Sequence, residues 1–169
     1  LSCENEIYPR NLLLNEFSSI FDCYYRDGFI GRMHLPLAGR HNISNSLAVI
    51  ALGLELGIKP QRIEESLAAF KGTERRFQLQ LEAKGIKLID DYGHHPTELR
   101  VTLEAAKNVR HKRLLVVFQP HRFSRTKFLM DEFAESLSLA DYTIVTDIYA
   151  ASEEPIAGVS AEALRDKIK

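Results

Sequence analysis

The stretch that decides the fold is Asp90-Asp91-Tyr92-Gly93-His94-His95-Pro96-Thr97-Glu98. The apolar run at 86–89 precedes it and predicts a buried strand, and Pro96 opens an amphipathic helix that extends to Lys107. The segment between them therefore joins a strand to a helix at the carboxyl end of the strand, where open α/β sheets bind ligands. A turn needs only Asp and Gly, whereas this one also carries a phenol and two imidazoles. That density of ionisable groups predicts a functional site.

The chain beyond residue 72 alternates between the two types of secondary structure. We expect strands at 77–81, 86–89, 113–118 and 142–146, and helices at 96–107, 125–139 and from 160 onward. Strands that alternate with helices predict βαβ units, and hence a Rossmann-like α/β domain with a mostly parallel sheet.

The preceding residues show a different pattern. Two strands at 17–26 and 29–35 are joined by the turn dipeptide Asp27-Gly28, a helix is expected at 46–56, and Pro60 opens another that closes at Gly72. We place a domain boundary near Gly72, which divides the chain into domains over 1–72 and 73–169.

Composition is typical of a globular protein, with 169 residues, 45% hydrophobic and 27% charged. A net charge of -1 provides no global field for nucleic acid or an acidic membrane, so neither is an expected partner. No apolar run is long enough to span a membrane. Cys3 and Cys23 form no CxxC pair and fit a reduced, cytoplasmic protein better than a disulfide framework.

Two segments of the first part carry polar groups that allow two interpretations each. Gly39–Asn45 either caps the following helix or offers the amides of Asn42 and Asn45 to a nucleotide. Arg75 and Arg76 are either solvated or clamp a phosphate at the domain boundary.

Two further segments follow strands in the second part. The histidines of Asp90–Glu98 could face water in a capped turn, bind zinc without the usual HxxxH or Cys partners, or act in acid–base and anion-positioning chemistry. Phe118–Thr126 also leads from a strand into a helix, so it should lie at the same sheet edge. Arg122 and Arg125, three residues apart, would hold a carboxylate or phosphate there.

These four segments, in this order, resemble the muramate–alanine ligase branch of the Mur ligase family. The resemblance rests on the motifs GRHNISN, GTERRF, DDYGHHPTE and FQPHRFSRT, and the segment DIYAASEEPI also fits the family pattern. The resemblance implies ATP-dependent addition of L-alanine to UDP-N-acetylmuramate in peptidoglycan precursor synthesis. ATP phosphorylates the muramyl carboxylate, and the alanine amine attacks the acyl phosphate. ATP and Mg²⁺ are the implied cofactors.

The resemblance also implies roles for individual residues. Those expected on the ATP side are His41, Asn42, Asn45, Arg76 and Asp91. Those expected around the muramyl and alanine end are Tyr92, His94, His121, Arg122 and Arg125.

Several parts of the family pattern have no counterpart in this sequence. It contains no GxxxxGK[ST] phosphate loop, no match to the family's magnesium-binding Glu and His, and no N-terminal UDP-binding domain. We therefore expect the end of the central ATP-binding domain followed by most of the C-terminal ligase domain. The partners of this fragment would be the missing segments of the same enzyme, and most of the metal ligands would lie in those segments. The fragment alone would hold no complete catalytic set, so we expect it to be inactive.

Two other functions remain open. The chain could be a non-catalytic nucleotide- or sugar-phosphate-binding module. It could also be a metal-dependent hydrolase built on Asp90, Asp91, His94 and His95.

Overall fold

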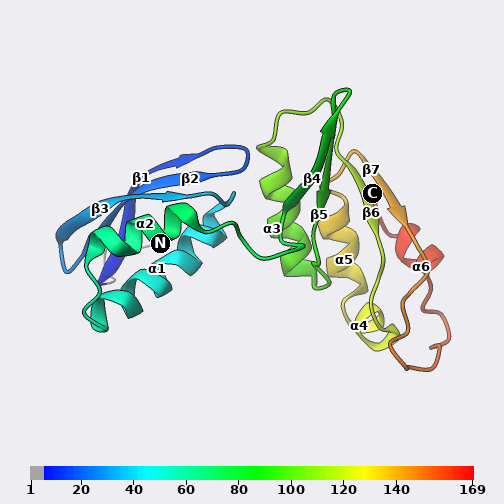
Figure 1. Ribbon diagram of the computed structural model, residues 1–169. Coiled ribbons are helices and arrows are strands. Elements are labelled where there is room, and N and C mark those ends of the chain that lie inside the picture. Colours follow the sequence, from blue (N-terminus) through cyan, green and yellow to red (C-terminus); the bar gives the residue numbers. More distant parts are fainter. Residues whose placement is uncertain (1–5) are drawn as a thin grey trace. The chain divides into compact units, whose positions relative to one another are not determined.

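The computed structural model describes residues 6–169, so Cys3 lies outside the described part (Figure 1). Backbone proximity divides the chain into two compact units, one up to Ile89 and one from Asp90 onward. Each unit has its own hydrophobic core. The domain boundary near Gly72 stays a prediction.

The first unit is a three-stranded antiparallel sheet packed against two helices. Its strands are β1 (Ile7–Leu14), β2 (Ser19–Tyr25) and β3 (Gly28–Leu35), in that order across the sheet, and its helices are α1 (Arg40–Glu55) and α2 (Pro60–Ala69). Alternate residues of β2 and β3 meet one face of each helix, as the two-residue period of a strand requires. The buried core consists of Phe21, Cys23, Met33, Leu35, Ile43, Leu47, Ile50, Ile63 and Leu67. Strand β1 was not expected from the sequence.

The turn between β2 and β3 lies one residue earlier than predicted. Tyr25 pairs with Gly28, so Arg26 and Asp27 are the two loop residues. Both have positive φ, 47° and 62°, as a type I′ hairpin turn requires. The prediction placed Gly28 in the turn, but the strand pairing makes it the first residue of β3.

Helix α1 begins at Arg40 rather than at Ser46. Gly39 is its N-cap residue with φ 91°, and the Asn42 side-chain amide donates to the carbonyl of Ala38 at 2.7 Å. Ile43, three residues before Ser46, is already fully buried in the core. Packing therefore stabilises about a turn and a half of helix before the predicted start at Ser46.

A hairpin follows in the same unit, formed by β4 (Gln78–Ala83) and β5 (Ile86–Asp90). The strand at 86–89 was expected to be buried. Instead, Ile86 is 65% exposed and Leu88 55% exposed, and β5 pairs with β4. An apolar run predicts a strand, but only the other layers of a fold decide whether the strand is covered.

The second unit is the α/β part of the chain. It contains α3 (Pro96–Lys107), β6 (Leu115–Phe118), α4 (Phe123–Phe128), α5 (Met130–Leu137), β7 (Tyr142–Val145) and α6 (Ala161–Arg165). Strands β6 and β7 pair in parallel, which confirms the predicted α/β class and the parallel pairing. The core is made of Leu99, Phe118, Phe133, Ala134, Leu137 and Leu164. Among residues 6–169, no helix is long and apolar enough to cross a membrane.

The helix expected at 125–139 is divided into α4 and α5. Leu129 between them has φ -117° and ψ 20°, outside the helical range, and it packs on the core. The hydrogen bonds from Leu129 to Arg125 and from Phe133 to Leu129 continue across this point, at 3.0 and 2.9 Å. Two backbone hydrogen bonds therefore span the break between α4 and α5, and Phe133 is fully buried while Phe128 is exposed.

Candidate functional site

The turn before α3 is held by its own side chains. Asp91 Oδ1 accepts a hydrogen bond from the amide of Gly93 at 2.7 Å, and Glu98 Oε2 accepts from the amides of His94 and His95 at 3.0 and 3.1 Å. His95 is the N-cap residue, and its Nδ1 accepts from the amide of Thr97. These bonds satisfy amides that the first turn of a helix leaves unpaired.

Gly93 is required by this arrangement. A Cβ atom at that position would lie 2.8 Å from Asp91 Oδ1 and 3.5 Å from the Cβ of Glu98. The carboxylate of Asp91 therefore lies close over the glycine, where a larger residue would displace it.

The second turn follows β6, and the two turns meet. The ring centroids of His94 and His121 lie 5.8 Å apart. Tyr92 packs edge-on against His94 at 5.1 Å. Nη1 of Arg125 lies 3.3 Å from His121 Nδ1 and 3.5 Å from the carbonyl oxygen of His94. One guanidinium therefore contacts both turns. The prediction that the turns share one sheet edge is wrong, because β5 pairs with β4 whereas β6 pairs with β7.

The proton positions on the two imidazoles follow from these contacts. Nδ1 of His94 lies 3.0 Å from the Tyr92 carbonyl oxygen, which can only accept, so this nitrogen carries a proton. Nδ1 of His121 faces an arginine, which can only donate, so this nitrogen is an acceptor. Partial burial, then Arg125, Arg122 and His94 in that order, lower the pKa of His121. His121 therefore favours the neutral form.

A third connection, which the sequence had assigned no role, completes the cluster. The ring of Tyr149, after β7, stacks on His121 with centroids 5.4 Å apart. Glu153 accepts hydrogen bonds from the amide and the hydroxyl of Ser124, and these bonds lower the pKa of Glu153. Both residues belong to the segment DIYAASEEPI. The signal that could have found them is position: they follow a third strand, parallel to β6.

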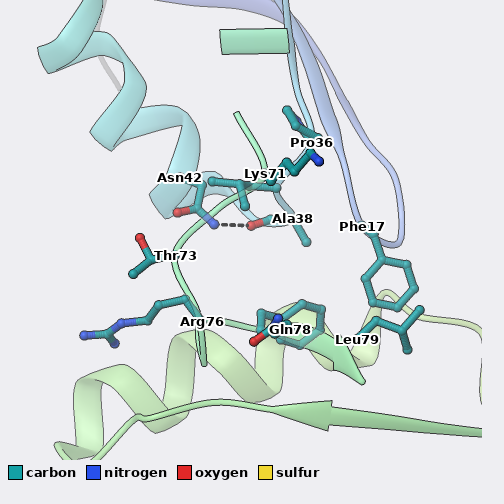
Figure 2. A pocket seen from close by; sticks show the side chains of 11 residues that line it. Phe17, Pro36, Ala38, Asn42, Lys71, Thr73, Arg76, Gln78 and Leu79 are labelled. Carbon is teal, nitrogen blue, oxygen red and sulfur yellow. Dashed lines mark hydrogen bonds between the residues drawn. The ribbon is translucent and has the colours of Figure 1, made fainter. Parts of the chain in front are cut away.

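The predicted ATP-side residues are distributed over both units. In the first unit, Asn42 and Arg76 line one cavity of about 400 Å³ (Figure 2). Lys71 and Thr73 add polar groups, and Phe17, Pro36, Leu37, Ala38, Phe77, Gln78 and Leu79 complete the lining. His41 and Asn45 belong to the first two turns of α1, but neither lines this cavity. Asp91 belongs to the second unit.

The cavity combines an apolar wall with cations. The rings of Phe17 and Phe77 lie 6.0 Å apart, and Arg76 and Lys71 belong to the same lining. The guanidinium of Arg76 extends away from the side on which Phe17 lies (Figure 2). A nucleotide needs an apolar wall for its base and cations for its phosphates. The lining of the cavity contains both kinds of group.

The described residues offer little to a metal ion. Within 6–169, no group of three or more His, Cys, Asp or Glu side chains is arranged to hold one. The zinc site considered for Asp90, Asp91, His94 and His95 therefore has no support in this part of the chain. The same result gives no support for a magnesium site within the described residues.

Comparison with known proteins identifies the fold. A family model described as "Mur ligase, glutamate ligase domain" matches residues 75–169, more than half of the chain. The chain belongs to the Mur ligase family. The Mur ligase chain is 52% identical over 153 residues to the UDP-N-acetylmuramate–L-alanine ligase of Solibacter usitatus, a match that covers 90% of the chain and 32% of that protein. It is 47% identical over 166 residues to the enzyme of the same name from Pelotomaculum thermopropionicum, covering 98% and 36%.

A solved structure agrees with these sequence matches. The crystal structure of the UDP-N-acetylmuramate–alanine ligase of Thermotoga maritima matches with a TM-score of 0.80 and 30% identity, covering 98% of this Mur ligase chain and 35% of that protein. The chain thus spans about a third of the length of the relatives that it matches.

Proposed function

We propose that this chain supplies the acceptor-binding surface and part of the nucleotide site of an ATP-dependent UDP-N-acetylmuramate–L-alanine ligase. The observation that carries the proposal is the convergence of His94, His121 and Arg125 from two separate strand-to-helix turns. The names of the relatives over nearly the whole chain support the same reaction.

The acceptor end of such a reaction needs cations that do not titrate. Its substrates bring the muramyl carboxylate and the carboxylate of L-alanine, and the acyl phosphate adds further negative charge. Arg125, positioned between the two turns, and Arg122 would hold carboxylate, because guanidinium pairs with it in a bidentate geometry. A neutral His121 would avoid charge repulsion with Arg125 beside it. The rings of Tyr92 and His94 would border the same surface.

The nucleotide end would use the cavity of the first unit. Arg76 and Lys71 would face phosphate, while Phe17 and Phe77 would together form an apolar wall against the base. His41, Asn45 and Asp91 remain proposed ATP contacts on the basis of the family motifs. Magnesium would be held by other parts of the ligase.

A hybrid enzyme tests the proposal. The chain replaces the matching third of the Solibacter usitatus ligase, and phosphate release from ATP is measured. We expect release that requires both UDP-N-acetylmuramate and L-alanine, with the unmodified Solibacter enzyme as the control. A folded, monodisperse hybrid that binds ATP without turnover would favour the non-catalytic nucleotide-binding module instead.

A further inference from the structure

The segment that follows β7 is bonded along its length to the turn that carries the two arginines. His121 and Tyr149 form a parallel bridge outside the named strands. The amide of Tyr149 donates to the carbonyl of Pro120, and the amide of Arg122 donates to the carbonyl of Tyr149, both at 2.8 Å. The backbone before Arg122 is therefore fixed by a neighbour that lies more than twenty residues later in the sequence.

Glu153 extends this attachment past the arginine. One oxygen of its carboxylate accepts from the amide of Ser124 at 2.9 Å, and the other accepts from the Ser124 hydroxyl at 2.7 Å. Ser124 lies between Arg122 and Arg125 in the sequence. The positive charge of Arg122 acts on Glu153 as well and contributes to its lowered pKa.

The backbone of Arg122 needs such support. Its φ of 74° and ψ of 135° lie in a region that glycine adopts readily and that side chains with a Cβ rarely adopt. A non-glycine residue keeps this conformation only when the surrounding bonds impose it. Those bonds come from Tyr149 on one side and Glu153 on the other.

We propose that Glu153 is a positioning residue of the acceptor site, which holds Ser124 so that Arg122 and Arg125 face the same carboxylate. This inference rests on the proposed function for the identity of the acceptor. Glu153 itself would not touch substrate, because Ser124 occupies both of its carboxylate oxygens. Without the Glu153 carboxylate, Arg122 and Arg125 would no longer be held toward the same carboxylate of the acceptor. The cavity in the first unit would not change.

Kinetics of the hybrid ligase provide the first test. We expect Glu153→Ala to raise the KM for L-alanine or UDP-N-acetylmuramate roughly 3- to 10-fold, the range for losing such hydrogen bonds, with the KM for ATP unchanged. Glu153→Gln should recover part of the loss, because its amide oxygen still accepts from Ser124. The control is Glu154→Gln, which removes the same charge from the exposed neighbouring residue. Equal increases in all three KM values, or no increase, would overturn the positioning role.

Hydrogen exchange in the 169-residue chain provides a second test that does not depend on activity. Glu153→Ala should speed amide exchange at Ser124 and Arg122 roughly 3- to 10-fold, while Glu154→Gln should not. Unchanged exchange at both amides would refute the inference whatever the kinetics show. A hybrid that folds but lacks turnover, with exchange altered as expected, would instead count against the proposed function alone.

Discussion

Nη1 of Arg125 lies 3.3 Å from Nδ1 of His121, and the same nitrogen lies 3.5 Å from the carbonyl oxygen of His94. The arginine thus links two turns that are about thirty residues apart in the sequence. Since a guanidinium can only donate, it fixes the acceptor nitrogen of His121 and opposes protonation of the ring.

The pKa of His121 should therefore respond to Arg125. Burial is the largest cause of the lowered pKa and Arg125 is the second, so Arg125→Gln should raise the pKa of His121 part of the way toward 6.5. Histidine ring NMR over a pH series measures this. Arg100→Gln, which removes a charge paired with Glu135 on another face, serves as the control. An unchanged pKa of His121 in Arg125→Gln would contradict the contact.

The sign of the effect on stability follows from linkage. Because the folded chain binds the His121 proton less readily than the unfolded chain, the unfolded state takes it up first as the pH falls below 6.5. The contribution of His121 to stability is therefore complete above that pH and decreases toward the lowered folded pKa. Arg125→Gln should weaken this loss, which denaturant titrations at several pH values would detect.

Substitutions at the two ends of the proposed site should separate the substrates. In the hybrid ligase, Arg122→Ala or Arg125→Ala should raise the KM for the muramyl substrate or alanine by about 10-fold or more, because each would remove a charge-assisted bond. Asn45→Ala should raise the KM for ATP instead. The opposite pattern would refute both assignments.

The chain by itself should not catalyse the reaction. It contains no GxxxxGK[ST] phosphate loop to hold the transferred phosphate. We expect no L-alanine-dependent ATP hydrolysis by the purified 169-residue chain, under conditions in which the hybrid ligase turns over. Hydrolysis that survives further purification and disappears in Arg125→Ala would disprove this expectation.

The core of the second unit can be tested by a matched pair of phenylalanines. Phe133 of α5 is fully buried and its ring packs on Phe118 of β6, whereas Phe128, five residues earlier, is 78% exposed. Phe133→Ala should lower the free energy of unfolding by about 3–5 kcal/mol, through lost burial and a cavity. Phe128→Ala should change it by less than about 1 kcal/mol. Urea titrations followed by circular dichroism compare the two, and similar losses would contradict the different burial of the two side chains.

The thiol of Cys23 reports on the first unit. Burial in the core raises its pKa to about 12, so almost no thiolate forms in mildly alkaline buffer. We expect Cys23 to resist alkylation in the folded chain and to react in denaturant, as followed by peptide mass spectrometry. Rapid labelling under native conditions would show that the helices do not cover the sheet at this position.

Much of the architecture could be predicted because its signals are local. The turn at 90–98, the helix that Pro96 opens and the parallel pairing of β6 with β7 all follow from periodicity and residues at element ends. What failed depended on packing. The burial of Ile43 accompanies the extension of α1 to Arg40, and the helix expected at 125–139 is divided at Leu129, which packs on the core.

The sequence by itself determined the order of the elements, the type of the second unit and the turns that carry ionisable side chains, because motifs and periodicity are written in consecutive residues. The tertiary structure alone decided that Arg125 links His94 to His121, and that Tyr149 and Glu153 belong to the same cluster. Such contacts join residues from separate strand-to-helix connections. His94 follows β5, which pairs with β4, while His121 and Tyr149 follow the parallel strands β6 and β7. The contacts therefore depend on how these connections pack in three dimensions, which no local pattern encodes.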